Sequence, residues 1–179
     1  MRSVRRMSLA IATCALGIAL PGSATAQIPM VLGGFNAGVQ AGVSVPSGTS
    51  ADDYDLGWTA AAFLAYHPIG ATLSVRALIS YMRFDPADSS TLVNSANVMG
   101  YSGDLVARIP ATYVRPFLLG GAGVYNRTGF GTRFGWHAGG GFAFTFLERT
   151  LLFEVRYVKV PGSGEDRLRT FPVTLGLVF

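Results

Sequence analysis

Five charged residues are the strongest candidates for chemistry in this sequence. Each lies on the polar face of a segment in which polar and apolar residues alternate. The five residues are Arg76, Asp104, Arg108, Glu154 and Arg156. Gln40 and His137 hold equivalent positions in their own segments. A charge inside a fold must be paired, because burying an isolated ion is costly. We therefore predict a buried ion-pair network that fills the interior; the alternative is a polar path or gate.

The two histidines and an acidic segment are the remaining candidates. Neither His67 nor His137 has a neighbouring nucleophile and orienting carboxylate of the kind that activates a catalytic group. Oxygen-rich loops can bind Ca²⁺ or Mg²⁺. The acidic residues are Asp52, Asp53, Asp55, Asp85 and Asp88, and their spacing matches no EF-hand. We predict no catalytic residue, no metal site and no cofactor, and interpret the acidic segment as a solvated loop.

Composition restricts the class of protein that positions these residues. The chain has 179 residues, which fits one domain; 50% are hydrophobic, 13% are charged and 23 are glycine. An ordinary globular protein has about a quarter of its residues charged. No internal run reaches the ~20 apolar residues of a membrane-spanning helix. This combination favours a barrel in which apolar residues are dispersed at every second position.

The first 26 residues have the pattern of a secretory signal peptide. Three arginines precede the apolar segment 7–20, Pro21-Gly22 interrupts it, and Ala24 and Ala26 form a small-x-small cleavage site. We predict cleavage before Gln27, with the barrel domain over 27–179. A lipoprotein signal with Cys14 as the acylated residue is the weaker alternative.

Cleavage would change the charge and the cysteine content. Removing Arg2, Arg5 and Arg6 from the 14 basic residues leaves 11 against 10 acidic ones, a net charge of +1. The basic charge of the precursor is therefore no reason to expect nucleic acid as a partner. The single cysteine leaves with the signal peptide, so we expect no disulfide and no thiol chemistry.

The C-terminal segment 168–179 shows the clearest strand pattern. Its large apolar residues recur at every second position: Phe171, Val173, Leu175, Leu177 and Phe179. Successive side chains of a strand leave the backbone on opposite sides, so these five share one face.

The same alternation predicts eight strands in all. Their expected ranges are 32–45, 56–66, 71–84, 95–109, 113–126, 134–146, 151–160 and 168–179. Longer loops (46–55, 85–94, 127–133 and 161–167) alternate with tight turns (67–70, 109–112 and 147–150). Transmembrane barrels have an even strand number, with short periplasmic turns and longer extracellular loops. We predict an all-β, eight-stranded, antiparallel up-and-down transmembrane barrel, and we leave the faces of strand 113–126 unassigned.

These features resemble the OmpA-like outer-membrane β-barrel family. The likeness rests on strand order, loop lengths and the stretches at 42–46, 114–117, 121–125 and the C-terminal strand. It implies the bacterial outer membrane as location, and the face of Phe171 to Phe179 as the signal read by the barrel-assembly machinery. It also implies contact with outer-membrane lipids and lipopolysaccharide, and we expect a monomer. No peptidoglycan-binding domain follows the last strand, so a wall-anchoring role is not expected.

A soluble barrel with its apolar face inward is the structural alternative. A solvent-facing surface of Gly, Ser and Thr with few charges would be poorly soluble, whereas the same residues suit a barrel interior. We therefore expect an outward girdle of aromatic residues near the membrane interfaces: Trp58, Tyr66, Tyr101, Tyr125, Trp136, Phe146 and Tyr157.

Three classes of function remain open at this point. The first is a structural or surface-interaction barrel with a lumen plugged by side chains, and the second is a small pore for ions or solutes. The third is a lipid A-modifying enzyme of the kinds found among eight-stranded outer-membrane barrels. Deacylases of that kind have a His–Ser pair two residues apart, but His137 is followed by Ala138 and Gly139. We therefore expect a non-enzymatic protein.

Overall fold

The computed structural model describes residues 34–48, 50–68, 72–86, 95–111, 113–129, 131–146, 149–162 and 168–179. The predicted signal peptide, with Ala24 and Ala26, lies outside these residues. Eight strands and one short helix are described: β1 (Gly34–Pro46), α1 (Ser50–Asp53), β2 (Gly57–His67), β3 (Leu73–Phe84), β4 (Ala96–Arg108), β5 (Val114–Arg127), β6 (Gly131–Phe146), β7 (Arg149–Val160) and β8 (Leu168–Val178).

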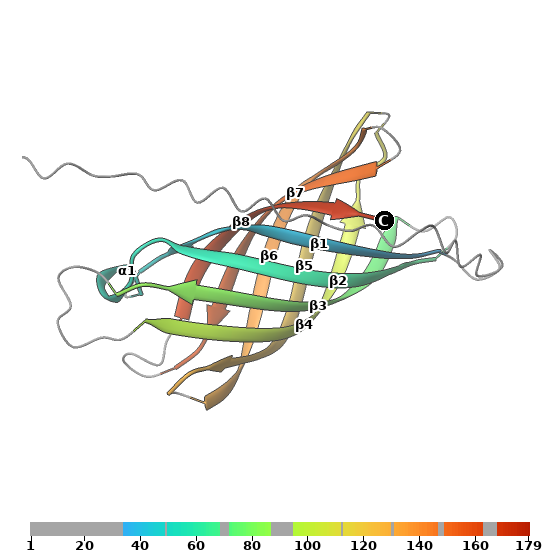
Figure 1. Cartoon of the computed structure of the whole chain (residues 1–179). Coiled ribbons are helices and arrows are strands. Elements are labelled where there is room, and N and C mark those ends of the chain that lie inside the picture. Colours follow the sequence, from blue (N-terminus) through green and yellow to red (C-terminus); the bar gives the residue numbers. More distant parts are fainter. Residues whose placement is uncertain are drawn as a thin grey trace, which may run out of the picture.

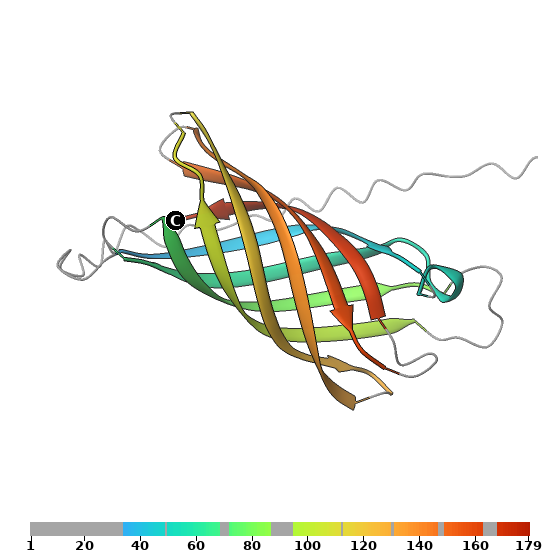
Figure 2. The same cartoon turned by 180° about the vertical axis from the view of Figure 1, so that it is seen from behind.

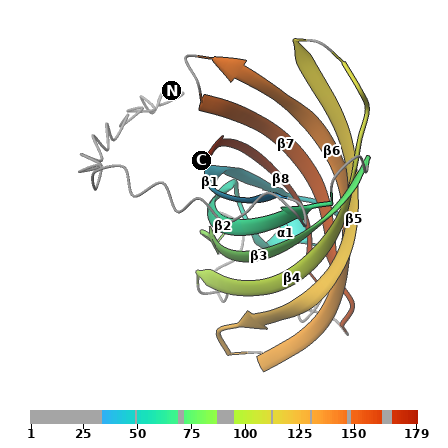
Figure 3. The ribbon, with the colours of Figure 1, turned by 90° about the vertical axis from the view of Figure 1, so that its right-hand side faces the viewer.

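The eight strands form a closed barrel in sequence order, with every neighbouring pair antiparallel. The strands cross the barrel obliquely (Figures 1 and 2). The ring closes between β1 and β8, where Val39 pairs with Leu177 and Val45 with Phe171. Figure 3 shows these two strands side by side. The prediction of an eight-stranded up-and-down barrel is confirmed.

The two ends of the barrel differ. The loop end carries α1 and the C-terminal ends of β1, β3, β5 and β7; the turn end carries the C-terminal ends of β2, β4, β6 and β8 (Figure 1). Among the described residues, no helix is long and apolar enough to cross a membrane.

The outer face of the barrel is apolar, as the alternation predicts. Leu64, Val75 and Leu105 are each at least half exposed, and Leu175 on β8 is 66% exposed. Residues at the intervening positions, such as Ser74, Arg76 and Thr174, are buried in the barrel. A soluble barrel would reverse this arrangement, so the exposed apolar surface is the one suited to lipid.

The predicted strand limits differ most from the structure at β6. This strand begins at Gly131 rather than at 134, and it pairs with β5 as far as Arg127↔Gly131. Gly129 and Gly131 have φ angles of 86° and 78°, which glycine adopts without steric cost. The expected loop 127–133 is therefore a tight connection at the end of a long hairpin.

Aromatic residues surround the barrel near both ends. Towards the loop end, Trp58 packs on Tyr81, and Tyr157 lies between Trp136 and Phe171, with ring centroids 5.0–5.6 Å apart. Towards the turn end, Phe35 packs on Tyr66 at 4.9 Å. Rings at two levels are typical of transmembrane barrels, because amphipathic aromatic side chains favour the two interfaces.

The predicted girdle is wrong for one residue. Tyr125 is 4% exposed and points into the lumen. It follows Gly121 and Gly123 at every second position of β5, and glycines carry no side chain that reveals which face they occupy. The side chain of Phe146 lies outside the described residues.

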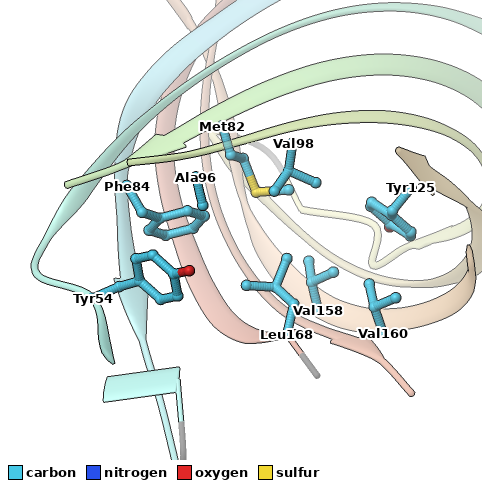
Figure 4. Packing of buried hydrophobic residues seen from close by; sticks show 9 residues of the cluster. All are labelled: Tyr54, Met82, Phe84, Ala96, Val98, Tyr125, Val158, Val160 and Leu168. Atoms are coloured by element: carbon cyan, nitrogen blue, oxygen red, sulfur yellow. The ribbon is translucent and has the colours of Figure 1, made fainter. Parts of the chain in front are cut away.

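Two apolar clusters occupy the lumen at different heights. The loop-end cluster comprises Tyr54, Met82, Phe84, Ala96, Val98, Tyr125, Val158, Val160 and Leu168. In Figure 4 these side chains converge from several strands, and Tyr54 reaches them from the segment after α1. The turn-end cluster comprises Phe63, Ala65, Leu78, Val106, Phe117, Leu119 and Leu152. Polar side chains fill the level between the clusters.

The outward face of β6 yields a stability prediction. Ala138 is exposed near the middle of the strand, where it pairs with Gly120 and Tyr157. Replacing Ala138 by Arg is expected to lower the free energy of unfolding in lipid vesicles by about 2–4 kcal/mol, because it places a charge at the bilayer midplane. Equilibrium urea titration measures the change. Thr132→Arg, ~20 Å along the same strand, is the control and should cost about 0–1 kcal/mol. Equal costs at the two positions would contradict the outward, mid-bilayer placement of Ala138.

Candidate functional site

Four of the five predicted charged residues meet in the middle of the lumen. Arg76 comes from β3, Asp104 from β4, and Glu154 and Arg156 from β7, and each is at most 6% exposed. We call these four residues the ion-pair belt. With two positive and two negative charges, the belt is balanced.

Arg76 connects opposite sides of the barrel. Its Nε and Nη2 atoms donate to Oδ2 of Asp104 at 2.9 and 2.7 Å, and its Nη1 atom donates to Oε2 of Glu154 at 2.8 Å. Arg156 closes the ring of charges: its Nε donates to Oε1 of Glu154, and its Nη2 lies 3.2 Å from Oδ2 of Asp104. Each carboxylate therefore faces both guanidinium groups.

His137 and Tyr125 extend the belt across β6 and β5. Nε2 of His137 lies 2.6 Å from Oδ1 of Asp104, and the hydroxyl of Tyr125 lies 3.1 Å from Nδ1 of His137. These partners fit a neutral ring in which Nε2–H donates to the carboxylate and Nδ1 accepts from the phenol. On β1, Gln40 donates to Oε1 of Glu154 at 3.4 Å.

Glycines on the neighbouring strands make room for these side chains. Asp104, Gly121 and His137 are register partners across β4, β5 and β6, so Asp104 and His137 meet above a position that has no side chain. A Cβ at Gly121 would lie 2.6 Å from Nε2 of His137 and 2.9 Å from Oδ1 of Asp104. In the same way Glu154 and Arg156 pair with Gly141 and Gly139. The glycine-rich segments of β5 and β6 therefore leave the space that the side chains of the belt occupy.

The predicted network is corrected in one member. Arg108 lies on the same face of β4 as Asp104, but four residues further along the strand, which is ~13 Å away. It lines a cavity at the turn end instead. His137, one of the two further polar candidates, contacts the belt through Asp104. The contact of Tyr125 with this network was not predicted. The only indication in the sequence is that Tyr125 occupies the same face of β5 as Gly121 and Gly123, four and two residues before it.

The cavity has a volume of about 150 Å³ and lies between the belt and the turn end. Its inner wall includes Arg76, so the cavity is closed on that side by the belt. On the opposite side of the belt, the loop-end apolar cluster fills the lumen (Figure 4).

The predicted assembly signal occupies the outer face of β8. Phe171, Leu175, Leu177 and Phe179 are exposed, and Val173 is half-buried. The main chain of Phe179 exchanges two hydrogen bonds with Ala37 of β1, at 2.9 and 3.1 Å, so the terminal residue belongs to the closing seam of the barrel. The signal itself remains a prediction.

The described residues contain no group of three or more His, Cys, Asp or Glu side chains that could hold a metal ion. The side chains of Asp52 and Asp53, and Asp88 as a whole, fall outside that description. Within the belt, Asp104, His137 and Tyr125 form an acid–imidazole–hydroxyl chain. The side chains of the acid and the imidazole have 0% exposure.

A closed eight-stranded barrel with an apolar exterior, aromatic girdles and a lumen in which a charged belt lies between two apolar clusters defines an integral membrane β-barrel of the outer-membrane type. The model of the family "outer membrane protein beta-barrel domain" matches residues 10–179. The chain belongs to this family, and its location is the bacterial outer membrane.

Solved structures show the same fold. The crystal structure of Neisserial surface protein A (NspA) aligns with a TM-score of 0.60 and 12% identity, over 80% of this chain and 95% of that one. The crystal structure of the outer membrane enzyme PagL aligns with a TM-score of 0.53 and 14% identity, over 82% and 99% of the two chains. A search of curated proteins finds no match to the sequence.

Proposed function

We propose that this protein is a non-enzymatic outer-membrane barrel with a structural or surface-interaction role, and that its lumen is closed by side chains. The observation that carries the proposal is the unbroken connection from Asp104 through Arg76 to Glu154, which joins β4 to β7 across the lumen. The balanced charges need no mobile counter-ion. The loop-end cluster adds a second, apolar barrier.

The burial of His137 supports a non-enzymatic role, although PagL is an enzyme. His137 is 2% exposed and is held between Asp104 and Tyr125. His67 lines the turn-end cavity beside Arg108 and Arg115. An activated nucleophile needs a base within hydrogen-bond reach and access for its substrate. The inaccessible His137 does not meet the second requirement.

The outer surface of the barrel indicates which molecules the protein would contact in this role. The apolar outer face with its aromatic girdles suits outer-membrane lipids and lipopolysaccharide, and the exposed side chains of β8 suit recognition by the barrel-assembly machinery. The closed ring has no free strand edge, which is consistent with a monomer.

The competing role is a small pore, and conductance separates the two. The folded, unmutated protein in planar lipid bilayers is expected to conduct no more than a protein-free bilayer, because ions would have to cross a desolvated, paired belt. Differing gel mobility of unheated and boiled samples confirms folding before each measurement. Large, stable conductance steps from the folded protein would overturn the plugged-lumen proposal and favour the pore.

A further inference from the structure

The turn-end cavity has the two features of a binding site for an amphiphilic anion. Part of its wall is apolar and consists of the rings of Phe63 and Phe117 with Val106 and Leu152, all of them buried. Its outer part carries the guanidinium groups of Arg108 and Arg115. Arg115 is exposed and Arg108 is half-buried, so both lie at the rim.

The charge of the lining is one-sided. Three arginines line the cavity, namely Arg76, Arg108 and Arg115, and none of its described lining residues is acidic. Arg76 is engaged with Asp104 and Glu154 in the belt. Arg115 donates to Oγ1 of Thr145 at 3.0 Å, which holds its side chain across the β5–β6 pair. Cations in a concave, low-dielectric site reinforce one another's attraction for an anion.

The volume limits the size of the ligand. A dry apolar cavity of about 150 Å³ holds one molecule the size of benzene. Phe63 and Phe117 supply aromatic surface for a flat ring, and the rim supplies charge-assisted donors for a carboxylate. We propose that the turn-end cavity binds a compact aromatic carboxylate, with its ring against Phe63 and Phe117 and its carboxylate at Arg108 and Arg115.

Benzoate is the probe for this proposal. Isothermal titration of the folded protein in lipid nanodiscs, with empty nanodiscs as the blank, is expected to show saturable binding. Benzyl alcohol, which lacks the charge, and inorganic phosphate, which lacks the ring, are each expected to bind at least about tenfold more weakly, because each loses one of the two kinds of contact. Equal affinity for either analogue would overturn the assignment, as would the absence of saturable benzoate binding.

Matched variants localise the site. Arg108→Gln combined with Arg115→Gln is expected to weaken benzoate binding at least about tenfold. Ala143→Leu, which fills the cavity from β6, should weaken it to a similar extent. Arg83→Gln is the control: Arg83 is 48% exposed at the loop end, 3.8 Å from Asp85, and its loss should leave the affinity unchanged. Heat-dependent gel mobility verifies the fold of each variant. Unchanged binding by the folded double variant would overturn the proposal.

Discussion

Replacing Glu154 by alanine is expected to lower the free energy of unfolding in lipid vesicles by about 3–5 kcal/mol. Glu154 is 1% exposed and neutralises both Arg76 and Arg156. Alanine would leave the belt with two buried cations and a single carboxylate, that of Asp104. It would also leave Nε2 of Gln40 without its acceptor. Urea titration followed by tryptophan fluorescence measures the loss.

The exposed ion pair of Arg83 and Asp85 supplies the control for this prediction. Its side chains are 48% and 70% exposed and lie 3.8 Å apart. Asp85→Ala is expected to change the free energy of unfolding by about 0–1 kcal/mol, as for surface ion pairs in general. If Glu154→Ala cost no more than Asp85→Ala, the belt would be hydrated rather than dry. The plugged-lumen proposal would then lose its physical basis.

Replacing Gly121 by alanine is expected to cost about 3 kcal/mol or more, a large effect for one methyl group. The added Cβ would lie 2.2 Å from the carbonyl oxygen of Gly103, which is main chain and cannot turn aside. It would also push against both His137 and Asp104, whose short contact it would break. Overpacking and an unsatisfied buried carboxylate therefore act together.

The neighbouring Gly120 provides a control one residue away. It points to the opposite face of β5, and a Cβ there meets no atom within 4 Å. Gly120→Ala is expected to change stability by less than about 1 kcal/mol. The histidine ring signals in NMR spectra give a second measurement, because only Gly121→Ala should shift those of His137. Similar effects of the two substitutions would contradict the inward facing of Gly121.

Much of the fold was predictable because the bilayer and the lumen are such different surroundings. Wherever one face of a strand meets lipid and the other meets polar side chains, large apolar residues recur at every second position, as in β8. That regularity identified all eight strands and their connections. It located most strand ends within two residues, and it identified the inward face of Arg76, Asp104, Glu154 and Arg156.

The alternation was uninformative where side chains are absent. The glycine-rich middle of β5 offers no contrast between its faces, so the inward position of Tyr125 depended on the register with β4 and β6. At the β5–β6 connection, the positive φ angles of Gly129 and Gly131 extended a hairpin that composition had indicated to be a loop. Both departures arise at glycines, which carry no side chain to reveal a face and adopt backbone angles that other residues avoid.

By itself, the sequence determined the class of fold, the strands and the face on which the five predicted charges lie. Only the tertiary structure decided which charges meet. A face is a local property, repeated every two residues, whereas the height of a residue in the lumen depends on the strand registers and on the closure of the ring. Those registers align Arg76, Asp104, Gly121 and His137 in one row. They also place Arg108 ~13 Å from Asp104, at the rim of the turn-end cavity.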